Sequence, residues 1–248
     1  MERILLLPAK KGGAPRTILV RRITDAEELA DMYAQRTRVY KRYGYLKEEP
    51  DAAPFIDKDL FDDDNCVYIG AFTGGRIIGS LRLVRTHPLP IRRYFDFTVP
   101  NAVQGIPENQ IFEISRLVVE RTDEDGGIPR NIILLFLADA TLAYAHQQNT
   151  KVAYAYIKER LLKKLARLRF PVERIGNFTC TYPHDGVMAP YFYGQPDDSA
   201  IPTVLAFDTV QEYLDATLRS GRMFDVTDGT YSLRDSVFNR FLSRLGIL

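Results

Sequence analysis

The chain has 248 residues, of which 46% are hydrophobic and 26% charged, and its formal net charge is +1. These values are ordinary for a soluble globular protein, and they exclude a bulk electrostatic attraction to nucleic acid or to a membrane surface. Any charged partner must therefore be met by a local patch. The length suits one large domain or two small ones with a substantial core.

Cysteine usage and hydropathy exclude several further classes of protein. Cys66 and Cys180 are the two cysteines, and neither has a CxxC partner or a suitably spaced histidine, so no disulfide framework and no metal site are predicted. No stretch is long enough to span a bilayer, and the apolar run ILLLPA is too short for a signal peptide. We expect a cytoplasmic protein without stable membrane insertion.

The first half of the chain alternates strand and helix patterns around an acidic loop. The capping box Thr24-Asp25-Ala26-Glu27 opens a helix that runs to about Arg42 and ends at Gly44. The TGG turn at 73–75 predicts a hairpin. The strands predicted in this half are 16–23, 66–72, 76–86 and 111–119, with an irregular proline-rich segment at 88–110.

The second half predicts a crossover between parallel strands. Apolar residues recur every three to four positions over 128–148, as in a buried helix. Because strands flank this helix, we expect a mixed α/β sheet. The other predicted elements are strands at 151–156, 172–181 and 201–207 and helices at 157–169, 209–219 and 233–245. We expect 1–207 to form the main domain and 208–248 a helical extension packed on it.

The strand at 111–119 carries a carboxylate and a guanidinium among apolar residues. In a regular strand, residues three positions apart face opposite sides, so either Glu113 or Arg116 would have to enter the core. A β-bulge would turn both toward one cleft and leave a backbone N–H free to receive the oxyanion of acyl transfer from a thioester. A strand-edge ion pair between the two residues is the alternative.

Five segments, in order, resemble signatures of the acyl-homoserine-lactone synthases. They are RTRVY with GY at 36–45, DLFD at 59–62, GSLRL at 79–83, EISR at 113–116 and ERLLKKLARLRFPVERIG at 159–176. The resemblance covers about residues 36–176 and implies the GNAT acyltransferase fold, a mixed central sheet flanked by helices and splayed at a bulged fourth strand. It also implies an acyl-phosphopantetheine co-substrate, on acyl carrier protein or CoA, with no permanently bound cofactor.

Departures from that pattern concern the acceptor. Lactone synthases usually have a tryptophan just after the first helix, and this chain has none, which argues against S-adenosylmethionine. The tail APYFYGQPDDSAIPTVLAF resembles the related long-chain N-acyl amino acid synthases. The resemblance therefore implies transfer of a fatty acyl group from acyl carrier protein to the amine of an amino acid or similar small molecule. The alternatives are an autoinducer lactone synthase that uses S-adenosylmethionine and a non-catalytic domain that binds acyl carrier protein.

The resemblance also implies roles for individual residues. Glu113 is the expected base for the amine, and Arg116 would orient Glu113 or hold a substrate carboxylate. Backbone N–H groups of Leu117, Val118 and Val119 would bind the oxyanion and the pantetheine arm. The expected substrate-binding residues are Arg36, Tyr40, Asp59, Asp62, Arg82 and Ser115. Solvated surface is the alternative for the two aspartates and the two arginines, and plain core packing is the alternative for the tyrosine.

A basic amphipathic helix is predicted at 157–169. Carrier proteins are acidic, so its basic face is a candidate docking patch. Exposure of these charges to water alone is the alternative. Nucleic acid is not an expected partner, because aromatic and basic residues do not interleave here. The residues expected to dock the carrier protein are Lys158, Lys163, Lys164 and Arg167.

Overall fold

The computed structural model describes residues 2–8, 15–47, 57–63, 65–120, 130–194 and 198–237. The strands are β1 Glu2–Leu7, β2 Arg16–Ile23, β3 Val67–Thr73, β4 Arg76–Val84, β5 Phe95–Phe97, β6 Ile111–Val119, β7 Val152–Lys158, β8 Glu173–Arg174, β9 Phe178–Cys180, β10 Ala200–Ala206, β11 Phe224–Thr227 and β12 Thr230–Leu233. The helices are α1 Ala26–Arg42, α2 Pro90–Tyr94, α3 Arg130–Gln147, α4 Glu159–Arg167, α5 Ala189–Tyr193 and α6 Phe207–Leu214, which a π-helical turn, Asp215–Arg219, follows.

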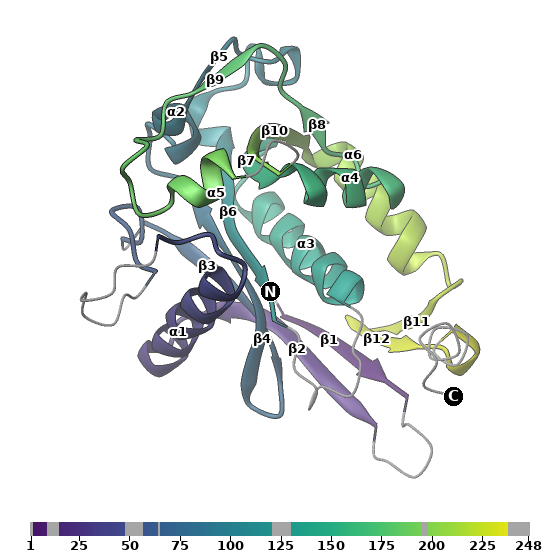
Figure 1. The fold of residues 1–248 in the computed structure, drawn as a ribbon. Helices are drawn as coiled ribbons and strands as arrows, with labels where there is room; N and C mark the ends of the chain where they lie inside the picture. Colours follow the sequence, from purple (N-terminus) through teal and green to yellow (C-terminus); the bar gives the residue numbers. More distant parts are fainter. Residues whose placement is uncertain are drawn as a thin grey trace.

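A mixed sheet of ten strands forms the centre of the fold (Figure 1). Its strand order is β11-β12-β1-β2-β3-β4-β6-β7-β10-β8, and β5 and β9 form a separate small sheet. The buried apolar residues fall into two clusters. One contains the inner side chains of α3, α4 and α6, and the other those of α1, α2 and α5. The sheet thus has a core on each face, as the mixed α/β prediction required.

Helix α1 is held by its ends and by one buried face. The Asp25 side chain caps the helix by accepting the backbone N–H groups of Glu27 and Glu28, so the cap lies one residue later than the predicted Thr24. Acidic residues occupy its first turn and basic residues its last, as the helix dipole favours. Residues at helical spacing, including Met32, Arg36, Val39 and Tyr40, face inward.

Strand β6 has a β-bulge at the predicted place. Ser80 of β4 pairs with Val118, whereas Arg82 pairs with Ser115, so two residues of β6 oppose one residue of β4. The first of these two, Arg116, has a φ of 55°, in the left-handed region. The bulge therefore changes the direction of the Arg116 side chain. As a result, Glu113 and Arg116 lie on the same side of the strand.

The sheet opens next to this bulge. Strands β6 and β7 run parallel around the α3 crossover, and their pairing extends from Ile111 with Val152 to Ile114 with Ala155. No residue beyond Ile114 in β6 pairs with β7, although both strands lie within the described ranges and continue. The predicted splay is thus confirmed, and it falls between β6 and β7.

Several elements differ from the sequence predictions. The prediction missed β1, a strand that pairs with both β2 and β12. The predicted strand 172–181 is two short strands, β8 and β9, in different sheets. Residues 224–233 form the hairpin β11–β12, so the helical description of 208–248 is wrong there, and 238–245 lie outside the described residues. None of the helices within the described ranges has the length and apolar character that a bilayer crossing requires.

Candidate active site

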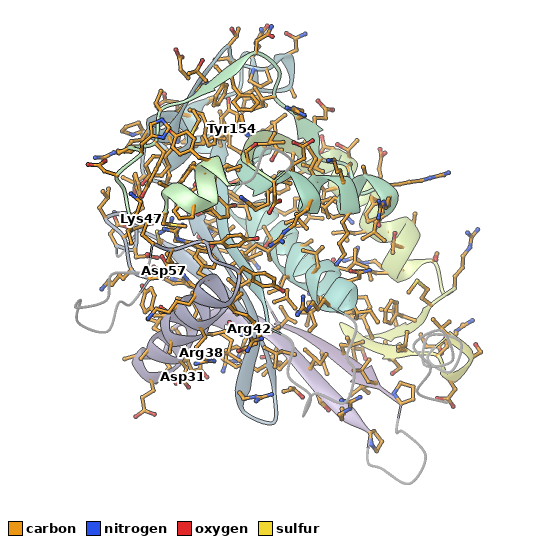
Figure 2. The ribbon with its side chains drawn as sticks, in the orientation of Figure 1. Asp31, Arg38, Arg42, Lys47, Asp57 and Tyr154 are labelled. Atoms are coloured by element: carbon orange, nitrogen blue, oxygen red, sulfur yellow. The ribbon has the colours of Figure 1, made fainter. Side chains whose placement is uncertain are left out.

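A network of charged side chains is buried where α1, β3 and β4 meet the acidic loop that precedes β3. The Arg36 guanidinium is 3.0 Å from the Asp57 carboxylate and 3.1 Å from that of Asp62. Asp57, which is labelled in Figure 2, thus lies against α1. Asp62 also lies 3.0 Å from Arg82 and accepts a hydrogen bond of 2.8 Å from the Tyr68 hydroxyl. Burial alone would raise the pKa of Asp62, but the charges of Arg82 and Arg36 outweigh it and hold that pKa well below its usual range.

The bulged strand holds the same loop from the other side. Arg116 Nη2 is 2.6 Å from Asp59 Oδ2, and Arg116 Nε is 3.4 Å from Asp57 Oδ2. Arg82 Nη1 is 2.7 Å from Asp59 Oδ1, and Arg82 Nε donates to the Ser115 hydroxyl at 3.1 Å. Against the effect of burial, Arg116 and Arg82 lower the pKa of Asp59. The three arginines and three aspartates of this network are therefore mutually paired.

The structure brings all the predicted substrate-binding residues together. The Arg116 guanidinium lies 5.7 Å from the centre of the Tyr40 ring, in cation–π range. Arg36 and Arg82 are 1% and 0% exposed, which excludes the alternative that they are solvated surface residues. The residues in or against the network are Arg36, Tyr40, Asp59, Asp62, Arg82 and Ser115.

Glu113 is completely buried beside this network. Its Oε2 accepts a hydrogen bond of 2.6 Å from the backbone N–H of Ile91. Burial raises the pKa of Glu113 to about 8, although the Ile91 N–H and then the charges of Arg82 and Arg116 act in the opposite direction. No ion pair joins Glu113 to Arg116, both of which the structure describes, so the strand-edge ion pair is wrong.

Four buried polar atoms near the splay have no hydrogen-bond partner among the described residues. They are Glu113 Oε1, Arg82 Nη2, the hydroxyl of Tyr156 and Arg116 Nε, which lies 3.4 Å from Asp57 Oδ2. Burial, and then the charge of Glu113, raises the pKa of Tyr156, so its hydroxyl stays protonated. Because buried polar groups are rarely left unpaired, these atoms mark a place where a substrate can supply the missing partners.

A cavity lies at the splay, and we call it the polar cavity because three cationic side chains are among those that line it. Arg116 and Tyr156 contribute to its wall from the two diverging strands, and Tyr40 contributes from α1. Leu117, the second residue of the bulge, also lines it, so the backbone of the bulge borders this space. The cavity is therefore open to a reacting group that lies between β6 and β7.

A second cavity, the apolar cavity, is lined almost entirely by apolar surface. It lies between the sheet and the helices α3, α4 and α6, and Leu134, Ala138 and Phe207 are among its lining residues. Five residues line both cavities, so the two spaces lie side by side at the splay. The shared residues are Ile114, Leu117, Ala155, Ile157 and Leu161.

The structure separates the four residues that were predicted to dock a carrier protein. Lys163 and Arg167 are exposed and Lys164 is half-buried on α4. Lys158 is 4% exposed and lines the polar cavity instead. Its assignment to an exposed docking face is therefore wrong, because Lys158 is the last residue of β7 and points inward with Tyr156, two positions earlier.

Sequence reasoning missed two residues of the site. Asp57 bridges Arg36 and Arg116, and its signal was its position two residues before Asp59 in the same acidic loop. Tyr156 lies in an alternating run of a β-strand, where nothing distinguishes an unpaired hydroxyl from a packed ring.

Comparison with known proteins points to one kind of chemistry. The model of the family described as N-acyl amino acid synthase FeeM matches residues 31–189. This range contains the buried network, the bulge and both walls of the splay. No curated protein sequence matches the chain.

Solved structures with the same fold include three acyl-homoserine-lactone synthases. The AHL synthase LasI shares 18% identity with a TM-score of 0.59, over 80% of this chain and 95% of its own. The CoA-dependent synthase MesI shares 20% identity with a TM-score of 0.54, over 79% and 94%. BjaI, another CoA-dependent synthase, solved with MTA, shares 19% identity with a TM-score of 0.55, over 97% and 98%. At these identities the likeness establishes the GNAT-type fold.

Proposed function

The chain belongs to the FeeM family of N-acyl amino acid synthases and is an acyltransferase, and we propose that it transfers a fatty acyl group from a phosphopantetheine thioester to the amine of an amino acid or similar small molecule. The position of the two cavities side by side at the splay is the observation that carries this proposal. A fatty acyl thioester has an apolar chain and a polar reacting end. The apolar cavity suits the first and the polar cavity the second.

Glu113 is the proposed base. A protonated amine has to lose a proton before it attacks, and a carboxylate whose pKa is near 8 is suited to accept that proton. Glu113 takes one proton from the ammonium group, and the nitrogen attacks the thioester carbon. The tetrahedral intermediate then collapses with cleavage of the carbon–sulfur bond. The second amine proton passes to the leaving sulfur, which departs as a thiol.

The bulge supplies the other proposed groups. Backbone N–H groups of Leu117, Val118 and Val119 lie on the stretch of β6 that has left β7, and they are the proposed donors to the oxyanion and to the pantetheine arm. Arg116 is paired with Asp59 and Asp57. Its proposed role is therefore to fix the acidic loop against the bulge and to add positive charge beside the oxyanion.

An acyl carrier protein is the proposed donor. The basic residues Lys163, Lys164 and Arg167 lie along α4, whose Leu161 lines both cavities, so an acidic carrier bound there would be close to the splay. Charge reversal at Lys163 and Lys164 is expected to raise the KM for acyl carrier protein about tenfold or more, with little effect on an acyl-CoA substrate. An unchanged KM for the carrier would show that the carrier does not bind to this face of α4.

Lipid extracts from a bacterium that expresses the protein test the reaction itself. We expect mass spectrometry to detect N-acyl amino acids that are absent from cells expressing Glu113→Gln. Acyl lactones in their place would support the autoinducer synthase that uses S-adenosylmethionine. No new lipid, together with tight binding to acyl carrier protein, would support a non-catalytic carrier-binding domain.

A further inference from the structure

Lys158 is a buried cation with unused hydrogen-bond donors. Its Nζ donates to the backbone carbonyl of Tyr191 at 2.8 Å and lies 5.3 Å and 5.4 Å from the ring centres of Tyr45 and Tyr191. An ammonium group has three donors, and this is the one hydrogen bond from Lys158 that the structure describes. Lys158 also lines the polar cavity. Its remaining donors are therefore available to a bound molecule.

The charges around Lys158 do not balance. Arg160 lines the same cavity, and its Nε is 3.3 Å from Asp198 Oδ2. The same carboxylate oxygen is 3.8 Å from Lys158 Nζ. Among the described residues, two cations thus share one carboxylate, which leaves one positive charge at this wall of the cavity. Burial lowers the pKa of Lys158, and the charge of Arg160 adds to that effect while Asp198 opposes it.

The charges of the other cations at the site are already matched by carboxylates. The three arginines of the buried network are paired with its three aspartates, including Arg116, which also lines the cavity. The unmatched positive charge of the cavity therefore lies at Lys158 and Arg160. A ligand with one negative charge would neutralise it and would use the free donors of Lys158.

We propose that Lys158, assisted by Arg160, binds the carboxylate of the acceptor, so that the preferred acceptors are amino acids and not simple amines. This inference rests on the proposed acyltransferase function. Lys158 lies two residues, or about 7 Å, along β7 from Tyr156. Tyr156 is in turn close enough to Glu113 for the charge of Glu113 to raise its pKa. An α-amino acid carries its carboxylate close to the reacting amine, whereas a donor's phosphate is separated from the thioester by the long pantetheine arm. The short distance favours the acceptor as the source of the anion.

The test compares each amino acid that the purified protein acylates with the amine formed by its decarboxylation. The measured quantity is the ratio of kcat/KM for the two acceptors. In Lys158→Met we expect this preference for the amino acid to fall about 10- to 100-fold, the range that a charge-assisted hydrogen bond is worth. The fall should come from a higher KM for the amino acid. Arg160→Met, at an exposed residue where misfolding is not expected, should shift the ratio in the same direction by a smaller factor.

Lys151→Met is the matched control, because it removes an exposed lysine just before the opposite end of β7. Its preference ratio should equal that of the wild type. A ratio unchanged in both Lys158→Met and Arg160→Met would overturn the inference, as would a higher KM for the acyl donor in place of the acceptor. Wild-type protein that acylates amines but no amino acid would also overturn it. Absence of transfer to any acceptor would instead refute the proposed function on which it rests.

Discussion

At the residue scale, the site is organised by the balance of buried charges. Each arginine of the network has an aspartate partner, so Glu113 would be a seventh charge without a cation of its own. Ionising it in a fully buried position is costly, which is why burial dominates its raised pKa of about 8. The same cost keeps Glu113 mostly protonated at neutral pH, so as the proposed base it would accept a proton at higher pH.

The raised pKa of Glu113 predicts a pH-dependent cost in stability. The folded state binds the proton of Glu113 more tightly than the unfolded state does, so stability is highest below the unfolded pKa and decreases as pH rises toward 8. Glu113→Gln should remove that decrease, which amounts to up to about 5 kcal/mol. Urea unfolding at pH 5.5 and pH 9 measures it. An equal effect of the substitution at both pH values would show that Glu113 has an ordinary pKa.

The same substitution predicts the kinetics of acyl transfer. Loss of a positioned base should lower kcat about 10²- to 10⁴-fold. In the wild type, kcat should increase with pH up to about 8 and then level off, since the ionised form of Glu113 is the active one. The profile is measured with acceptors whose amines have different pKa values. If the pH at which kcat levels off shifts with the pKa of the acceptor amine, the amine loses its proton to solvent and not to Glu113.

Asp62 is the clearest test of the paired network. Asp62→Asn would leave Arg36 and Arg82 each with one charged partner fewer in a buried setting. Removing one partner of a buried ion pair typically costs about 3–5 kcal/mol, so we expect a loss of that size in the free energy of unfolding at pH 7. Because the pKa of Asp62 is depressed, this difference should shrink as pH falls below about 4. Asp63→Asn, at the exposed neighbouring residue, is the control and should cost little.

Sequence patterns predicted the three arginines of the network and two of its three aspartates, but they missed Asp57. Glu113 and Arg116 were identified because charged groups in an apolar strand need an explanation. Lys158 was placed on the wrong surface, because a lysine between a strand and a basic helix has the same pattern whether it points outward or inward. The difference is set by the rings of Tyr45 and Tyr191, which come from segments far away in the chain.

At the element scale, one strand and one helix position the site. The bulge in β6 turns Arg116 toward the acidic loop, and the loss of pairing with β7 opens the cavity. Helix α1 brings Arg36 and Tyr40 to the same place from the other side. The bulge was predictable because, in a regular strand, either Glu113 or Arg116 of the EISR segment would have to enter the core. The hairpin β11–β12 was not, since its strands are four residues each and depend on β1, a distant partner.

The cap of α1 predicts a modest and local effect on stability. Asp25→Ala removes the acceptor for two backbone N–H groups and should cost about 1 kcal/mol. Asp31→Ala, at an exposed position in the same helix (Figure 2), is the control and should stay within about 0.5 kcal/mol of the wild type. Denaturant midpoints measure both changes. Equal midpoints for the two variants would mean that Asp25 does not cap the helix in solution.

At the scale of the whole molecule, the proposed function depends on the position of the two cavities relative to the sheet. Residues of α1 and α5 line the polar cavity, and residues of α3, α4 and α6 line the apolar cavity. The two cavities share lining residues at the splay, so the proposed acyl chain would lie on one face of the sheet with its thioester at the other. The order of the central elements was predictable from the sequence. The adjacency of the cavities was not, because the residues that line both come from β6, β7 and α4 and meet only in the folded chain.

The apolar cavity predicts the length of the acyl chain that is transferred. Ala138→Phe should fill part of this space and shift the products to shorter chains. Each methylene that no longer fits loses about 0.8 kcal/mol, or roughly fourfold in kcat/KM. Product lengths by mass spectrometry give the result. Ala143→Phe, on the same helix but away from the cavity wall, is the control, and an identical shift in both variants would locate the acyl chain elsewhere.

The location of the thioester is the central claim, and a crystal structure with a thioether analogue of palmitoyl-pantetheine tests it most directly. We expect the sulfur to lie in the gap between β6 and β7, within reach of the backbone at Leu117 and of the Tyr156 hydroxyl. The alkyl chain should lie under α3. An analogue bound outside this gap, with β6 and β7 paired along their full length, would contradict it.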